Sequence, residues 1–232
     1  MKNKKIIIIF VMLISFGVIS IVIINNFEYK QTPKRPNLSK KAYYLQEYLK
    51  KNKNDTDTLL ELGLTYSNNN ELAKAEETYL KLININNNIP IAWQRLGNVY
   101  VSMSKFDKAA AAYEKTIKLE PNNPSAYFLL SQVLLLWDID KAKDIGKKCI
   151  YLSKSTQDNW QYMQDYYNLI NQLGTEGLPE NTYKIYFNLI NDDFISSDEL
   201  KLALIDYSIS LYPNDKSDYK NKLLAIKAQL QK

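Results

Sequence analysis

The chain has 232 residues, of which 46% are hydrophobic and 24% charged, a composition typical of folded proteins rather than disordered or collagen-like ones. It has one Cys and no His, which excludes an intramolecular disulfide, a histidine-based nucleophile pair and multi-Cys or His-ligated metal sites. The positive net charge lies in residues 1–41, which hold eight Lys or Arg and one acidic residue. Because the remainder is slightly acidic, we expect no nucleic-acid partner.

The N-terminus has the pattern of a membrane anchor. Residues 1–5 are basic, and residues 6–24 are nineteen uncharged, mostly apolar residues. As a helix this stretch would be about 28 Å long, close to the ~30 Å of a bilayer's hydrocarbon core. It is followed by neither an Ala-x-Ala site nor a Cys, which favours an uncleaved signal anchor over a removed signal peptide or a lipoprotein anchor. We therefore expect a single-pass membrane protein that contacts the lipid bilayer through residues 6–24.

The orientation of this anchor follows from the flanking charges. The lysines of residues 1–5 adjoin the apolar stretch, whereas the first residues after it carry no positive charge. This favours a cytoplasmic N-terminus and a folded domain outside the cytoplasm. The basic residues between 30 and 41 leave the opposite orientation open, in which the domain is a cytoplasm-facing docking platform.

Residues 25–38 contain Pro33 and Pro36 among polar residues and predict an extended tether. Apolar residues at 38, 42, 45 and 49 then predict an amphipathic helix over 39–51.

A 34-residue repeat begins after this helix. The motif Leu59-x-x-Leu62-Gly63-x-x-Tyr66 recurs as Trp93-x-x-Leu96-Gly97-x-x-Tyr100 and then as Tyr127-x-x-Leu130-Ser131-x-x-Leu134. Ala75 and Tyr79 recur 34 residues later as Ala109 and Tyr113, and Pro121 closes the second unit. This pattern resembles the tetratricopeptide repeat (TPR), in which each unit is a hairpin of two helices. The resemblance implies units at 56–89, 90–123 and 124–154, of which the third is looser because Ser131 and Gly146 depart from the pattern.

The repeat also carries local packing signals. Gly63 and Gly97 lie within predicted helices, where glycine costs ~1 kcal/mol relative to alanine. We expect a close helix approach there, with Ala75 and Ala109 as the facing residues. Asn123, directly before Pro124, is predicted to cap the next helix.

Helical patterns continue to the C-terminus. They predict helices over 157–173, 179–191, from a capping box at Ser196-x-x-Glu199 to about residue 211, and over 216–230. We interpret residues 155–232 as diverged repeats and capping helices. The predicted fold is an all-α, TPR-type solenoid of helical hairpins behind one transmembrane helix.

No arrangement of residues points to catalysis. Cys149 lies at a position expected to be buried and inert, and the paired acidic residues are adjacent in sequence and so diverge on a helix. We expect no enzyme activity, no catalytic residue, no metal site and no cofactor. A catalytic membrane protein that uses its repeats to dock a substrate is the opposing reading, and no site supports it.

The resemblance implies a protein or peptide partner in the groove lined by the first helix of each unit. The groove positions that it implies are Leu60, Leu64, Ile91, Gln94, Asn98, Val101, Phe128, Gln132 and Leu135. Most are apolar, which favours an apolar or amphipathic ligand segment. Asn98 matches one position of the family's carboxylate clamp, but Gln94, Ser125 and Leu129 replace its cations, so no clamp is expected.

The predicted function is a membrane-anchored protein–protein interaction module that acts as a scaffold or chaperone-like assembly factor. Three alternatives stay open. The order of parts resembles the TPR subunits of bacterial cytochrome c maturation, which hold apocytochromes before haem attachment. The second is the cytoplasm-facing docking platform, and the third a homo-oligomeric structural protein.

Overall fold

The computed structural model describes residues 36–153, 160–174 and 179–232. The predicted anchor at 6–24 and most of the tether lie outside the described residues. Within the described ranges, no helix has the length and apolarity needed to cross a membrane.

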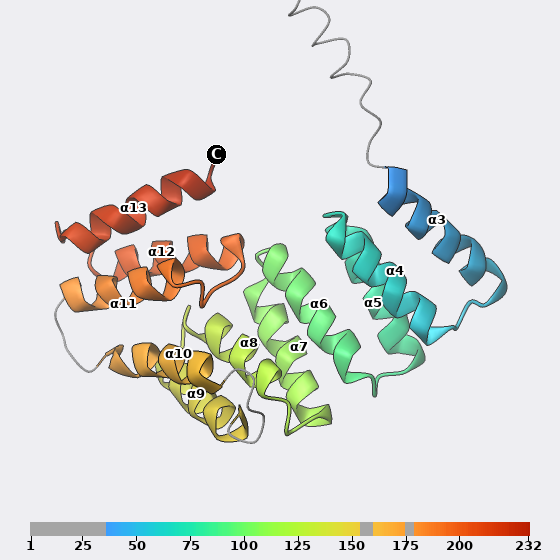
Figure 1. Ribbon diagram of the computed structural model, residues 1–232, viewed down its shortest axis with the longest axis horizontal. Helices are drawn as coiled ribbons and strands as arrows, with labels where there is room; N and C mark the ends of the chain where they lie inside the picture. Colours follow the sequence, from blue (N-terminus) through green and yellow to red (C-terminus); the bar gives the residue numbers. More distant parts are fainter. Residues whose placement is uncertain (1–35, 154–159, 175–178) are drawn as a thin grey trace, which may run out of the picture. The chain divides into compact units, whose positions relative to one another are not determined.

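The described residues are helical and contain no strand (Figure 1). The helices are α3 (Pro36–Lys51), α4 (Thr56–Asn68), α5 (Leu72–Ile85), α6 (Pro90–Ser102), α7 (Phe106–Leu119), α8 (Pro124–Leu134), α9 (Ile139–Ser153), α10 (Trp160–Gln172), α11 (Pro179–Asn191), α12 (Asp198–Leu211) and α13 (Asp218–Leu230). The chain divides into Met1–Lys41 and a folded unit at Ala42–Lys232. The boundary falls inside α3, which begins at Pro36, three residues earlier than predicted. Proline fits the first turn of a helix, where its missing N–H leaves no hydrogen bond unmade.

Three hairpins follow one another as the period predicts. The pairs α4–α5, α6–α7 and α8–α9 each pack closely, and each hairpin packs against the next (Figure 1). The third hairpin therefore forms despite its looser sequence. Asn123 caps α8 by accepting a hydrogen bond from the Ala126 N–H at 3.3 Å, which confirms the predicted cap.

The turns inside the first two hairpins repeat in their backbone as well. Asn70 and Ser104, 34 residues apart, have positive φ values of 60° and 55°. In each turn the following residue donates a hydrogen bond to the carbonyl five residues earlier, Glu71 N–H to Tyr66 and Lys105 N–H to Tyr100. This bond closes the C-terminus of the helix. The result is the left-handed C-terminal turn that glycine usually supplies, made here without glycine.

The close approach at the repeat glycines is real, but its predicted partners are wrong. A Cβ on Gly63 would lie 2.6 Å from Cε1 of Tyr79, and one on Gly97 would meet the ring of Tyr113. The tyrosines, and not Ala75 and Ala109, face the glycines, because a long side chain from the second helix reaches across the hairpin. The alanines are nonetheless fully buried.

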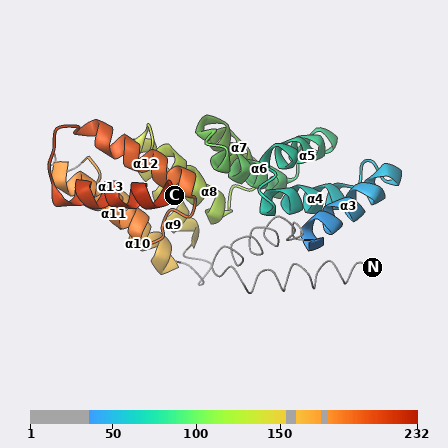
Figure 2. The ribbon, with the colours of Figure 1, turned by 90° about the horizontal axis from the view of Figure 1, so that it is seen from above.

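The C-terminal helices do not simply extend the array. Helix α10 packs on α9 and also contacts α11, and α11, α12 and α13 pack on one another (Figure 2). Helix α12 also contacts α6, about 100 residues earlier in the chain. In a regular solenoid each repeat contacts only its neighbours, so this contact folds the C-terminal helices back onto the repeats.

The cap of α12 differs from the prediction by one residue. Ser197, and not Ser196, caps the helix, because its Oγ accepts a hydrogen bond from the Leu200 N–H at 3.2 Å. The Ser197 hydroxyl also donates to Glu199 at 2.7 Å. Ser196 is exposed.

Candidate functional site

The candidate site is the surface formed by α4, α6 and α8, the first helices of the three hairpins, which we call the first-helix face. Of the nine predicted groove positions, Ile91 is exposed on it, and five are half-buried: Leu60, Leu64, Gln94, Asn98 and Phe128. The other three are buried: Val101, Gln132 and Leu135. Contact of a ligand with any of these positions stays a prediction.

The buried positions on α8 are covered by the chain's own C-terminal half. The connection between α11 and α12, residues 192–197, brings in Phe194 and Ile195, which are 7% and 0% exposed. The Gln132 side-chain amide donates a hydrogen bond of 2.5 Å to the Phe194 carbonyl. In this structure Gln132 and Leu135 are therefore inaccessible to a ligand. The repeat register alone placed them in the groove, without reference to the C-terminal helices.

An aromatic cluster holds the same connection. The ring centroid of Phe128 lies 4.8 Å from that of Tyr166, and the Tyr162 ring lies 4.9 Å from the Phe194 ring. The hydroxyl of Tyr166 is within 2.8 Å of the Ser131 hydroxyl, where the first two repeats have glycine. Burial raises the pKa of Tyr166, so the phenol stays neutral. Phe128 thus packs internally and contributes little open surface.

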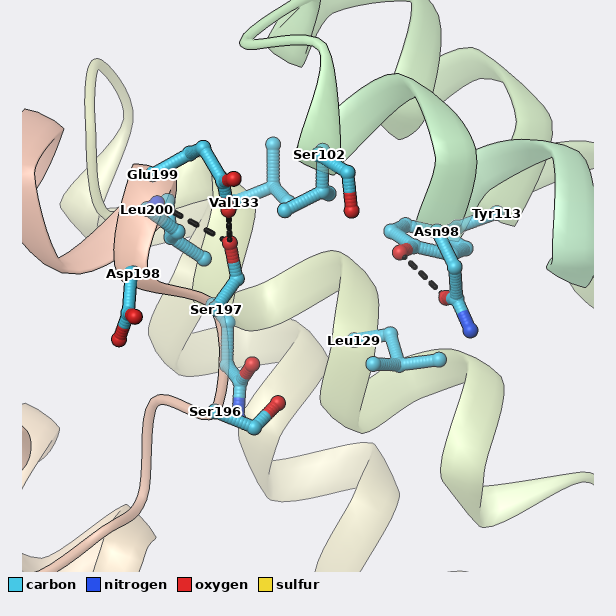
Figure 3. Close-up of a pocket in the computed structure, with 12 residues that line it drawn as sticks. Asn98, Ser102, Tyr113, Leu129, Val133, Ser196, Ser197, Asp198, Glu199 and Leu200 are labelled. Atoms are coloured by element: carbon cyan, nitrogen blue, oxygen red, sulfur yellow. Dashed lines mark hydrogen bonds between the residues drawn. The ribbon is translucent and has the colours of Figure 1, made fainter. Parts of the chain in front are cut away.

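A cavity of about 400 Å³ remains where the N-terminus of α12 meets the first-helix face. Figure 3 shows Asn98 and Leu129 on one side of it and Ser196, Ser197 and Glu199 on the other, and Val133 also lines it. The Tyr113 hydroxyl donates to Asn98 Oδ1 at 2.8 Å, and the Asn98 amide nitrogen points away from that bond (Figure 3). Tyr113 therefore fixes the amide so that its N–H groups are available to a carbonyl acceptor.

The open part of the face lies on α4 and α6. Leu60, Leu64 and Ile91 supply apolar surface there. Gln94 donates a 3.2 Å hydrogen bond to the hydroxyl of Ser125 in the next hairpin. These two residues occupy positions where the clamp would need cations, and they bond to each other. The arrangement thus suits an uncharged segment rather than a peptide carboxylate.

The described residues offer no group of three or more Cys, Asp or Glu side chains that could hold a metal ion. Cys149 is buried, as predicted, and its thiol donates to the Pro124 carbonyl at 3.3 Å. Burial raises the pKa of Cys149 to about 11. The thiol is therefore protonated and unreactive near neutral pH.

Comparison with known proteins identifies the repeats. Residues 56–89 and 90–123 each match a family model of the tetratricopeptide repeat. Both boundaries agree with the 34-residue period, so the chain contains TPR units within an all-helical solenoid. The two matches together cover residues 56–123, and tandem repeats of this kind form extended binding surfaces for protein segments. No curated protein matches the chain.

Several solved structures are similar to this chain. YrrB, described as a TPR protein with an unusual peptide-binding site, is 18% identical, with 81% of this chain and 99% of that chain covered and a TM-score of 0.49. MamA from Desulfovibrio magneticus is 17% identical, with 82% and 96% covered and a TM-score of 0.49. PilF of Pseudomonas aeruginosa is 16% identical, with 83% and 91% covered and a TM-score of 0.49. Similarity at this level carries no argument about function.

The C-terminal contribution to the site was not predicted from the sequence. Phe194 and Ser197 reach the first-helix face from a segment about 60 residues beyond α8. One signal was present, since two large apolar residues stand in an otherwise polar stretch, Asp192-Asp193-Phe194-Ile195-Ser196-Ser197. A pair of this kind in a loop indicates burial but not the surface against which it is buried.

Proposed function

We propose that this protein is a membrane-anchored interaction module that holds a segment of a protein partner on the part of the first-helix face formed by α4 and α6. The observation that carries the proposal is the combination of apolar surface at Leu64 and Ile91 with the oriented amide of Asn98. Apolar side chains of a ligand would pack on the leucine and isoleucine, and the amide would donate to a main-chain carbonyl. No charge on the ligand is needed.

The membrane attachment rests on the sequence of residues 6–24, with the folded domain outside the cytoplasm. Tethering a binding module to a membrane raises the local concentration of whatever it holds there. This suits a scaffold or a chaperone-like assembly factor better than a freely diffusing binder. The role needs no reaction chemistry at the face.

A site-specific photo-crosslinker tests the binding face. A benzoylphenylalanine at Ile91, 38% exposed on α6, should give discrete adducts with a partner protein in native membranes. The matched control is the same group at Leu80, 44% exposed on α5, the second helix of its hairpin. Equal adduct patterns at the two positions, or none at Ile91, would refute the proposed face.

The side of the membrane on which the folded domain lies is tested by cysteine labelling in intact cells. The chain carrying Asn214→Cys and Cys149→Ser should be labelled by a membrane-impermeant maleimide in intact cells and should remain with the membranes after alkaline carbonate extraction. Residue 214 is exposed. Labelling only after lysis would place the domain in the cytoplasm, and release by carbonate would remove the anchor from the proposal.

A further inference from the structure

We propose that residues 192–197, the connection between α11 and α12, are an internal ligand of the first-helix face, and that a partner segment of the same chemistry displaces them. That chemistry is an extended stretch in which an aromatic residue is followed by an aliphatic one, as in Phe194-Ile195. The inference rests on the proposed function and extends it to the part of the first-helix face on α8, beside the open part on α4 and α6.

The connection is held in the way that a bound peptide is held. Two successive main-chain carbonyls accept hydrogen bonds from side chains of other helices. Gln132 of α8 donates to the Phe194 carbonyl at 2.5 Å, and Tyr162 of α10 donates to the Asp193 carbonyl at 2.9 Å. Folded domains also bind extended peptides through hydrogen bonds to the peptide main chain and pockets for its side chains.

The connection also carries the features of a removable element. Asp193 has a φ of 54°, a left-handed conformation that costs a non-glycine residue conformational energy. The cavity of about 400 Å³, which is open to solvent, lies directly beside Ser196 and Ser197, so the start of α12 does not close over the first-helix face.

The internal segment limits the access of a partner to the part of the first-helix face formed by α8. It competes with the partner at an effective concentration in the millimolar range, as expected for a short covalent link. A free peptide of the same sequence should therefore bind weakly to the intact chain. Removal of the two apolar side chains should vacate their positions and let the peptide bind.

The binding experiment uses a fluorescein-labelled peptide with the sequence of residues 190–199. We expect at least about tenfold tighter binding to the full chain with Phe194→Ala and Ile195→Ala than to the unchanged chain, measured by fluorescence anisotropy. The control peptide carries the same two alanines and should not bind. A helical variant, verified by circular dichroism, that fails to bind the peptide would overturn the proposal.

The second measurement does not depend on that variant. In the chain with Ile195→Cys, the introduced thiol and Cys149 are both buried in one molecule, so each reacts with maleimide only when its own region opens. If residues 192–197 leave the face locally, the introduced thiol should be modified at least about tenfold faster than Cys149, as resolved by mass spectrometry. Equal rates would mean that both thiols are exposed only by global unfolding, which would also overturn the proposal.

The two proposals fail separately. Specific adducts at Ile91 without peptide binding would leave the proposed function standing and remove the internal ligand. Peptide binding and fast modification of the introduced thiol without specific adducts at Ile91 would show a self-contact on the face, with no partner protein on α4 and α6.

Discussion

Replacing Gly97 by alanine probes the feature that defines the hairpin packing. A Cβ at this position would lie 2.7 Å from Cδ1 of Tyr113, whose side chain is buried. The ring cannot swing away without cost, because its hydroxyl donates to Asn98 at 2.8 Å. Tyr113 must therefore shift within a filled interior, or α6 and α7 must separate.

The expected change in the free energy of unfolding is the balance of one stabilising and two destabilising contributions. Alanine gains ~1 kcal/mol of helix propensity over glycine. Overpacking costs ~1–3 kcal/mol, and weakening one hydrogen bond adds ~1 kcal/mol. We expect a net loss of ~1–3 kcal/mol, which for a domain of this size lowers the Tm by roughly 2–12 °C.

Thermal and urea unfolding followed by circular dichroism measure this loss. The decisive control is the same substitution in a Tyr113→Ala background, where the ring is gone and only the propensity term remains. There Gly97→Ala should stabilise by up to ~1 kcal/mol. If Gly97→Ala stabilises the unchanged chain, or has the same effect in both backgrounds, the ring-over-glycine packing is not what requires glycine.

Three further predictions concern caps, turns and ionisation. Asn123→Ala removes the acceptor of the Ala126 N–H and should cost ~1 kcal/mol in urea unfolding, while Asn122→Ala in the same turn should cost nothing; equal effects would refute the cap. Ser104→Gly relieves a φ of 55° and should stabilise by ~0.5–1 kcal/mol, so a lower urea midpoint would contradict the turn assignment. Burial raises the pKa of Tyr79 to about 12, so the unfolded chain loses this proton first, near pH 10, and the folded chain later. The contribution of the neutral Tyr79 phenol to the free energy of unfolding is complete below pH ~10 and falls by up to ~1.4 kcal/mol per pH unit between pH 10 and 12. If Tyr79→Phe leaves the alkaline slope of Tm against pH unchanged, this assignment is contradicted.

The sequence by itself determined the three hairpins. The 34-residue spacing of Leu62, Gly63 and Tyr66 places the same side chains on the same helix faces in each unit, so local periodicity is sufficient to predict helix, turn and helix. Asn123 was predictable for the same reason, since a cap acts within three residues of its own position. Even the third hairpin, without the glycine at 131, followed from its register.

Two other features, the neighbours of the repeat glycines and the cap of α12, depended on side-chain length and backbone path rather than on the repeat spacing. A tyrosine side chain is long enough to cross the hairpin, so the residue that faces Gly63 lies four positions beyond the expected Ala75. The capping box predicted Ser196 as the cap of α12, whereas the backbone brings Ser197 into that position, where its Oγ accepts from the Leu200 N–H. Sequence spacing contains neither piece of information.

The candidate site was decided by tertiary structure. The register placed Phe128, Gln132 and Leu135 on a groove, and on a regular array they would line it. With the return of α12 to α6 and the insertion of residues 192–197, Gln132 and Leu135 are buried, whereas Ile91 and the half-buried Leu60, Leu64, Gln94 and Asn98 keep exposed surface on α4 and α6. Periodic patterns encode contacts between neighbouring repeats, whereas a contact between segments 60 to 100 residues apart depends on how all the intervening helices stack.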